Sequence, residues 1–158
     1  MGLHLNVPEF QLNNRGEREH RNRIWWTAYI IDRMWASKLG QPASIQDDVI
    51  EVDLPSSGGL AQTIQEDFGD PHYMIASVRL AKLAELIIAS IYRRRGQQGP
   101  FAQRVQQALR DLRTWVEDLP SHLQMGTDEA SQIVPSHIVS LHLSFNQVSP
   151  NALIIPIH

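Results

Sequence analysis

Hydrophobic and polar positions along the chain recur at the three- and four-residue spacing of α-helices. The first such segment covers about residues 17–38, opens with charged residues and turns apolar at Ile24. One helical face is formed by residues at these spacings: Ile24, Ala28, Ile31 and Trp35. Further apolar residues widen that face: Trp25, Trp26, Tyr29 and Ile30. We therefore expect this helix to be central and buried.

Three further helices are predicted at about residues 71–95, 101–119 and 136–148. Their ends are marked by Pro71, Gly96, Pro120 and Pro135, since proline suits the first turn of a helix and also prevents its continuation. The helix predicted at about 101–119 has the clearest amphipathic stripe: Phe101, Val105, Ala108, Leu112, Trp115 and Leu119. Because no segment alternates like a half-buried strand, the fold class is all-α.

The stretch from Gly40 to Pro71 is predicted to be mostly loop, with a weakly indicated short helix near residues 61–66. Gly40 can supply the left-handed cap that ends the first helix. Between Asp47 and Asp70 the loop carries acidic residues and no Lys or Arg, whereas the following helices are rich in basic residues. These charges pair within the chain, leave the basic face for an acidic partner, or simply face solvent. We expect a bundle-like fragment of about four helices with a long acidic loop between the first two.

Composition is typical of one globular domain: 158 residues, 42% hydrophobic, with a formal net charge of -3. The chain has no cysteine, which excludes disulfides, a thiol nucleophile and a cysteine-held zinc site within it. Its charge does not favour non-specific binding to nucleic acid. No apolar run approaches the roughly 20 residues that span a bilayer, so no membrane partner is expected.

Candidate chemistry is sparse. His137 and His142 are five residues apart, and no other histidine has a second candidate ligand at helical spacing. Asp47 and Asp48 are adjacent acids that acid–base catalysis could use, but neighbouring loop side chains usually diverge. We therefore predict no catalytic, cofactor-binding or metal residues and no enzyme; turnover that is lost on mutating Asp47 or Asp48 would revive that alternative.

Several motifs occur in a fixed order. Residues 21–33 combine a basic stretch, a Trp-Trp pair, a tyrosine and an Asp-Arg dipeptide. A Leu-Gly-x-Pro turn follows at 39–42, then an acidic segment that ends in Leu-Pro at 54–55, and later a Trp-x-x-x-Leu-Pro closure at 115–120. Together they resemble the fungal-specific transcription factor domain, the middle homology region of fungal zinc binuclear-cluster regulators. The residues that match its pattern are Trp25, Trp26, Tyr29, Asp32, Arg33, Gly40, Pro42, Asp48, Leu54, Pro55, Trp115, Leu119 and Pro120.

The resemblance implies a regulatory domain that does not itself contact DNA and that modulates transcription by RNA polymerase II in the nucleus. In this family DNA and zinc are bound by a six-cysteine module, which this chain lacks. DNA is therefore expected as a partner only through that module, and no cofactor is expected here. Expected partners are proteins of the transcription machinery and a small-molecule effector.

The resemblance also suggests structural roles for the matching residues. The large aromatic side chains, including Trp35, are expected to anchor the core. Asp32 and Arg33 are expected to form a buried pair or to tether the loop. Gly40 and Pro42 are expected to set the turn after the first helix.

The ends of the chain depart from the family pattern. The family's domain begins upstream of Met1, and at the other end Pro150 and Pro156 are expected to interrupt any helix. We therefore expect a partial domain over residues 1–147 and an unrelated tail over 148–158. The alternatives are a free-standing helical protein-interaction module, which a co-purifying partner would favour, and a non-functional truncated gene product, which an insoluble or molten chain would favour.

Overall fold

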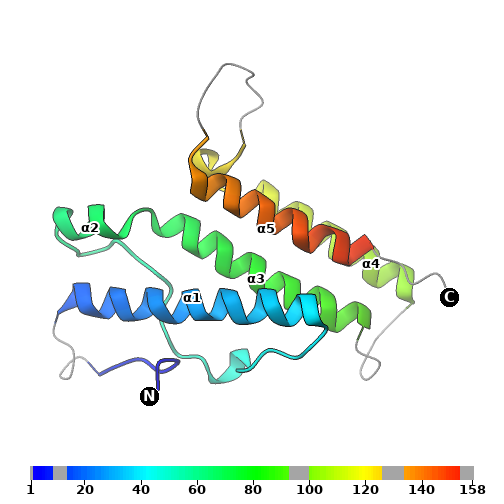
Figure 1. Cartoon of the computed structure of the whole chain (residues 1–158), viewed down its shortest axis with the longest axis horizontal. Coiled ribbons are helices and arrows are strands. Elements are labelled where there is room, and N and C mark those ends of the chain that lie inside the picture. Colours follow the sequence, from blue (N-terminus) through cyan, green and yellow to red (C-terminus); the bar gives the residue numbers. More distant parts are fainter. Residues whose placement is uncertain (1, 9–13, 93–99, 126–133, 154–158) are drawn as a thin grey trace.

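The fold is built from helices, as the computed structural model of the chain shows for residues 2–8, 14–92, 100–125 and 134–153 (Figure 1). The α-helices are α1 (Arg15–Leu39), α2 (Gln62–Phe68), α3 (Pro71–Tyr92), α4 (Phe101–Glu117) and α5 (Ser136–Leu153). Single 3-10 turns lie at Asp47–Val49 and Ser121–Leu123. Within these described ranges there is no β-strand. The all-α class is confirmed: the long helices are the four predicted ones, and α2 is the weakly indicated short helix.

The central element is α3. It packs against α1 on one side and against α4 and α5 on the other, so that α1 and α5 flank it in Figure 1. The prediction that the first helix is central is therefore wrong. The helix at 71–92 fills that place because small and apolar side chains cover both of its sides. Those facing α4 and α5 are Ala76, Leu80, Ala84 and Ile87, and those facing α1 are Val78 and Ala81.

The buried face of α1 is not the one that apolar spacing selects. Ile31 and Trp35 are 53% and 59% exposed, whereas Trp25, Trp26 and Tyr29 are buried. The expectation that Trp35 anchors the core is wrong. Because α1 is apolar on several sides, periodicity alone does not choose between its faces. The face of α1 that is buried also carries the side chains that form hydrogen bonds with the loop.

The core between α3, α4 and α5 follows the predicted stripes. From α4 the buried residues are Ala108, Leu112 and Trp115, followed by Leu119 just beyond the helix. Trp115 donates its indole N–H to the carbonyl of Ala76 at 3.1 Å and stacks on Phe145 at 5.4 Å between ring centroids. A buried indole with a partner for its N–H adds a large apolar area without an unsatisfied donor.

The helix ends follow local chemistry, with one exception. α1 begins after Asn14, whose side chain accepts the N–H of Gly16 at 2.9 Å, and it ends at Gly40 in the left-handed conformation (φ 64°). α5 continues through Pro150 to Leu153, so the expected helix break at Pro150 is wrong. A proline there removes one backbone hydrogen bond from a helix that ends three residues later, so few later turns depend on it. The predicted end of α3 near residue 95 and the tail beyond 153 lie outside the described residues.

The left-handed backbone of Gly40 gives a direct test of the α1 cap. No atom lies within 4 Å of a Cβ built there, so a larger residue would be opposed by the backbone conformation itself. We expect Gly40→Val to lower the free energy of unfolding by about 1–2 kcal/mol, the cost of a left-handed L-residue, measured by urea denaturation. Gly40→Asn should lose less, because asparagine tolerates this conformation. Equal stability of the two variants would contradict the argument.

Candidate functional site

Arg33 lies where α1, the loop over residues 40–61 and α3 meet. Its side chain is 1% exposed and is ion-paired with three carboxylates. The nitrogen–oxygen distances are 3.6 Å to Asp32, 2.6 Å to Asp47 and 3.1 Å to Glu85. A buried guanidinium requires such partners, because removal from water costs several kcal/mol. We call this group of side chains the Arg33 cluster.

The loop contributes further contacts to the Arg33 cluster. Arg33 donates to the carbonyl of Ile45 at 2.8 Å, and its guanidinium lies 3.5 Å from the ring centroid of Tyr29. The Tyr29 hydroxyl donates to Asp47 at 2.9 Å, and the ammonium of Lys82 on α3 lies 2.7 Å from the other Asp47 oxygen. Asp47 therefore connects the loop to both α1 and α3.

The environment fixes the charge of the Arg33 cluster. Burial pushes the pKa of Asp47 upward, but hydrogen bonds from Lys82, Tyr29 and Arg33 outweigh it and hold that pKa below its usual 3.8. Burial raises the pKa of the Tyr29 hydroxyl well above its ordinary value. Asp47 is thus ionised and Tyr29 protonated at neutral pH, which suits a structural clamp rather than acid–base catalysis. Asp48 is exposed at the surface.

Other side chains of α1 hold the same loop at further points. The carboxylate of Asp32 accepts the backbone N–H of Ser44 at 2.9 Å and its hydroxyl at 2.6 Å. The indole of Trp26 donates to the carbonyl of Asp53 at 2.8 Å. Of the two alternatives for the Asp-Arg dipeptide, the structure bears out the loop tether: both side chains hold the loop, and Arg33 is buried while Asp32 is 30% exposed.

A cavity of about 350 Å³ lies beside the Arg33 cluster, between α1, the loop and α3. Its apolar walls are Trp26, Tyr29, Ile50, Val52, Leu54 and Val78. Asp47, Arg79 and Lys82 add charge to the lining. Apolar walls with a few charged groups are typical of a small-molecule site.

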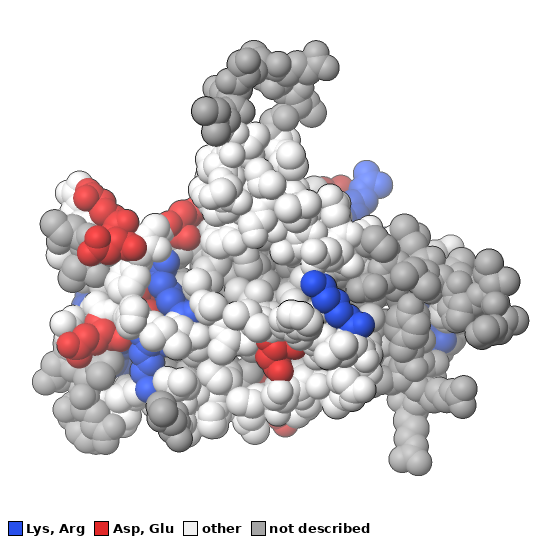
Figure 2. Space-filling model, in the orientation of Figure 1, with Lys and Arg blue, Asp and Glu red and all other residues white. Residues whose placement is uncertain are grey.

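A second hollow, about 210 Å³, separates α1 from α5 over the surface of α3. We call it the α1–α5 groove; its largest apolar residues are Ile30, Ile31 and Met34 of α1 and Tyr73, Met74 and Leu80 of α3. Ser140 and Ser144 line it from α5. On the face shown in Figure 2, acidic side chains gather at the end that holds α2, and most of the middle carries no charge.

The structure separates the predicted signature residues into two groups. Trp25, Trp26, Tyr29, Asp32 and Arg33 lie on α1, and Gly40, Pro42, Asp48, Leu54 and Pro55 lie on the loop that it holds. Trp115, Leu119 and Pro120 lie on the other side of α3 and line a separate cavity of about 310 Å³.

Sequence reasoning missed Glu85 and Lys82 as partners of the Arg33 cluster. The available signal was Glu85 itself, an acid inside the apolar run Leu83–Ile88. Two of the interpretations of the loop charges, pairing within the chain and exposure to solvent, both occur. Asp47 pairs with helix cations, whereas Glu66 and Asp67 are exposed on α2.

The Arg33 cluster predicts a large loss of stability on removal of its cation. Arg33→Met leaves the carboxylates of Asp47 and Glu85 facing each other, and we expect the free energy of unfolding to fall by about 3 kcal/mol in urea denaturation. The matched control is Arg113→Met, because Arg113 is 81% exposed in its pair with Glu117; it should change stability by less than about 1 kcal/mol. Equal unfolding midpoints for the two variants would contradict the importance of the cluster.

Comparison with known proteins shows which family this chain resembles. A family model described as "Fungal specific transcription factor domain" matches residues 1–124. Transcription factor FBD3 of Gibberella moniliformis is 30% identical over 141 residues, which cover 85% of this chain and 19% of that protein. An uncharacterized transcriptional regulatory protein of Schizosaccharomyces pombe is 24% identical over 146 residues, covering 92% of this chain and 18% of its own length.

A third relative, transcriptional activator protein acu-15 of Neurospora crassa, is 23% identical over 134 residues, covering 80% of this chain and 14% of that protein. No solved structure matches. The chain thus spans less than a fifth of the length of these relatives. Since the family model covers most of its residues, the chain belongs to the fungal-specific transcription factor domain family.

Proposed function

We propose that this chain is the regulatory, non-DNA-contacting domain of a fungal zinc-cluster transcription factor and that it acts in the nucleus on transcription by RNA polymerase II. The observation that carries the proposal is the family match over residues 1–124, with relatives named as transcriptional regulators. The chain itself has no cysteine with which to hold the family's zinc cluster. Contact with DNA and with that zinc would therefore come from a separate module.

A regulatory domain needs a site where a signal enters, and the cavity beside the Arg33 cluster supplies one. Asp47 lines this cavity and is also an ion-pair partner of Arg33. The two basic residues that line the cavity are Lys82 and Arg79, and Arg79 is exposed. Apolar side chains surround both of these basic residues. These features favour a small amphipathic anion as effector, with its charge at Arg79 and Lys82 and its apolar part against Trp26.

The α1–α5 groove is the candidate contact for a protein partner of the transcription machinery. Its walls are helices and its floor is α3, which is the geometry that accepts an amphipathic helix. Ile31 is 53% exposed at this groove, so apolar area is available to such a partner. A free-standing interaction module would use the same groove, and a truncated non-functional product would use neither surface.

No enzymatic activity is part of this proposal. The family is one of transcription factors. Asp47, a candidate for acid–base catalysis from the sequence, is held ionised by three hydrogen bonds. No described helix combines the length and apolar composition needed to cross a membrane.

A reporter assay tests the regulatory role. The whole chain is fused to a heterologous DNA-binding domain in a fungal reporter strain, and output is compared with that DNA-binding domain alone. We expect a change in output, and we expect Ile31→Asp to reduce that change, because a charge in the groove and the loss of an apolar anchor weaken binding about tenfold. Ile24→Asp is the control, because Ile24 is 48% exposed on α1 outside the groove. Identical output with and without the chain would contradict the proposal.

Binding of octanoate tests the effector cavity. Because Trp26 lines the cavity, we expect saturable quenching of tryptophan fluorescence by octanoate and weaker quenching by the uncharged octanol. Arg79→Gln should weaken octanoate binding about tenfold, the loss of one charge-assisted contact. Arg113→Gln, at an exposed position of α4, should leave octanoate binding unchanged. Equal affinity for octanoate and octanol would contradict recognition of an anion.

A further inference from the structure

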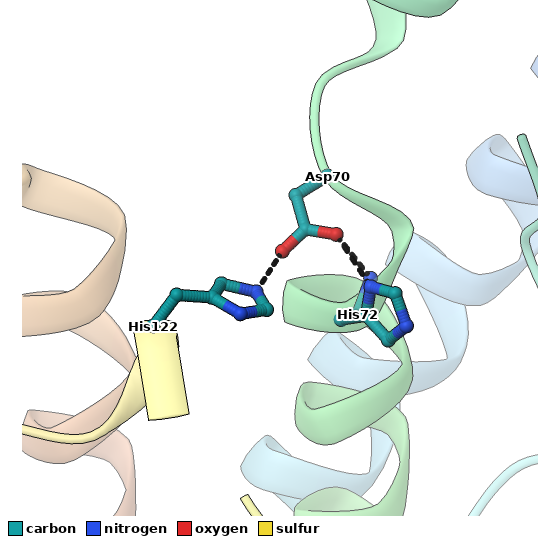
Figure 3. A group of neighbouring side chains, drawn as sticks. All are labelled: Asp70, His72 and His122. Atoms are coloured by element: carbon teal, nitrogen blue, oxygen red, sulfur yellow. Dashed lines mark hydrogen bonds and ion pairs between the residues drawn. The ribbon is translucent and has the colours of Figure 1, made fainter. Parts of the chain in front are cut away.

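A second cluster of titratable side chains lies away from the Arg33 cluster. It consists of Asp70 and His72 at the start of α3 and of His122 in the 3-10 turn that follows α4 (Figure 3). One ligand-type atom from each residue lies within 4.8 Å of the others. His122 is 52 positions from Asp70 in the chain. Only the folded chain assembles this group.

The carboxylate of Asp70 lies between the two imidazole rings, as Figure 3 shows. One oxygen lies 2.8 Å from Nδ1 of His72 and the other lies 2.6 Å from Nε2 of His122. Two imidazoles and one carboxylate are among the ligand sets that zinc takes in proteins. We propose that Asp70, His72 and His122 bind a zinc ion, a site separate from the cysteine-held zinc of the family.

The imidazole nitrogens that lie near Asp70 can also bind a metal ion. In each ring the nitrogen near Asp70 is the one that would bind the ion, and the second nitrogen points away from Asp70 (Figure 3). A neutral histidine carries its proton on either nitrogen. In its neutral form, each ring therefore offers a lone pair to the ion by changing tautomer. The ion then replaces the two hydrogen bonds that hold the rings against the carboxylate.

Backbone geometry holds the three ligands in place. Asp70 also accepts the backbone N–H of His72 at 2.9 Å, which orients its carboxylate at the start of α3. Next to His122, Leu123 is fully buried, and its N–H bonds the carbonyl of Pro120 at 2.9 Å. Such local anchoring is what a metal site needs so that the ligands do not have to be ordered on binding.

The site is open to solvent. The side chains of His72 and His122 are 59% and 54% exposed, and that of Asp70 is 33% exposed. With three protein ligands, a tetrahedral zinc ion keeps one position for water. Because both histidine side chains are more than half exposed, water can reach this position. A bound ion would join the start of α3 to the turn after α4 and stabilise the fold, because the folded chain, in which the three ligands lie together, binds it more tightly than the unfolded one.

Isothermal titration of the whole chain with zinc chloride tests the site. The chain is made without a histidine tag and freed of metal by a chelator. We expect one zinc ion per chain, with affinity reduced at least about tenfold by His72→Gln and by His122→Gln. His20→Gln is the control, since His20 is exposed on α1 outside the cluster, and it should bind as the unchanged chain does.

Thermal unfolding with and without zinc gives a second readout. Zinc should raise the unfolding temperature of the unchanged chain and of His20→Gln, but not of His122→Gln. Glutamine still offers an N–H to Asp70, so the metal-free variants should keep the helical circular dichroism spectrum. Absence of saturable zinc binding, or equal loss of binding in His20→Gln, would overturn the site. Neither result bears on the reporter assay, because the groove and the cluster share no residue.

Discussion

The burial of one cation, Arg33, constrains how half of the molecule is assembled. A guanidinium that is 1% exposed must be surrounded by acceptors, and its three carboxylates come from α1 itself, from the loop and from α3. For all three to reach it, the loop must fold back along α1, and α1 must lie on α3 with Arg33 beside Glu85. Packing of Trp26 and Tyr29 then follows on the same face. The polar cluster thus selects the face of α1, and the aromatic residues supply the buried apolar area.

The other half of the fold depends on a different interaction. Between α3, α4 and α5 the buried residues are apolar, and Trp115 satisfies its indole N–H on Ala76. This apolar packing contains no ion pair that a charged ligand could displace. On the α1 side, Asp47 and Lys82 are about one-third and one-half exposed, so their ion pair is open to competition from dissolved ions. The molecule therefore combines an apolar core with a loop held by polar contacts that dissolved ions can replace.

The sequence predicts local features well and long-range ones poorly. Helix positions follow from Pro and Gly and from apolar spacing, and the α4 stripe is buried as predicted, because each signal acts within a few residues. The face of α1 was mispredicted because its apolar residues surround the helix and its partner Glu85 is 52 positions from Arg33. In the same way, His122 is 52 positions from Asp70, a distance over which sequence spacing does not indicate contact. The Asp-Arg dipeptide was placed correctly, since the resemblance marked both its position and the nearby loop.

This division of the fold bears on how the proposed effector would act. A carboxylate that enters the cavity beside the Arg33 cluster meets Lys82, whose present partner is Asp47. If the incoming anion takes Lys82, Asp47 keeps only its contacts to Arg33 and Tyr29, and the link between loop and α3 weakens while the apolar core stays unchanged. Lys82 is on α3, which also forms the floor of the α1–α5 groove. Asp47 links Lys82 of α3 to Arg33 and Tyr29 of α1. In the proposed function, an effector that displaces Asp47 from Lys82 therefore loosens one of the contacts that hold α1, which is a wall of that groove, on α3.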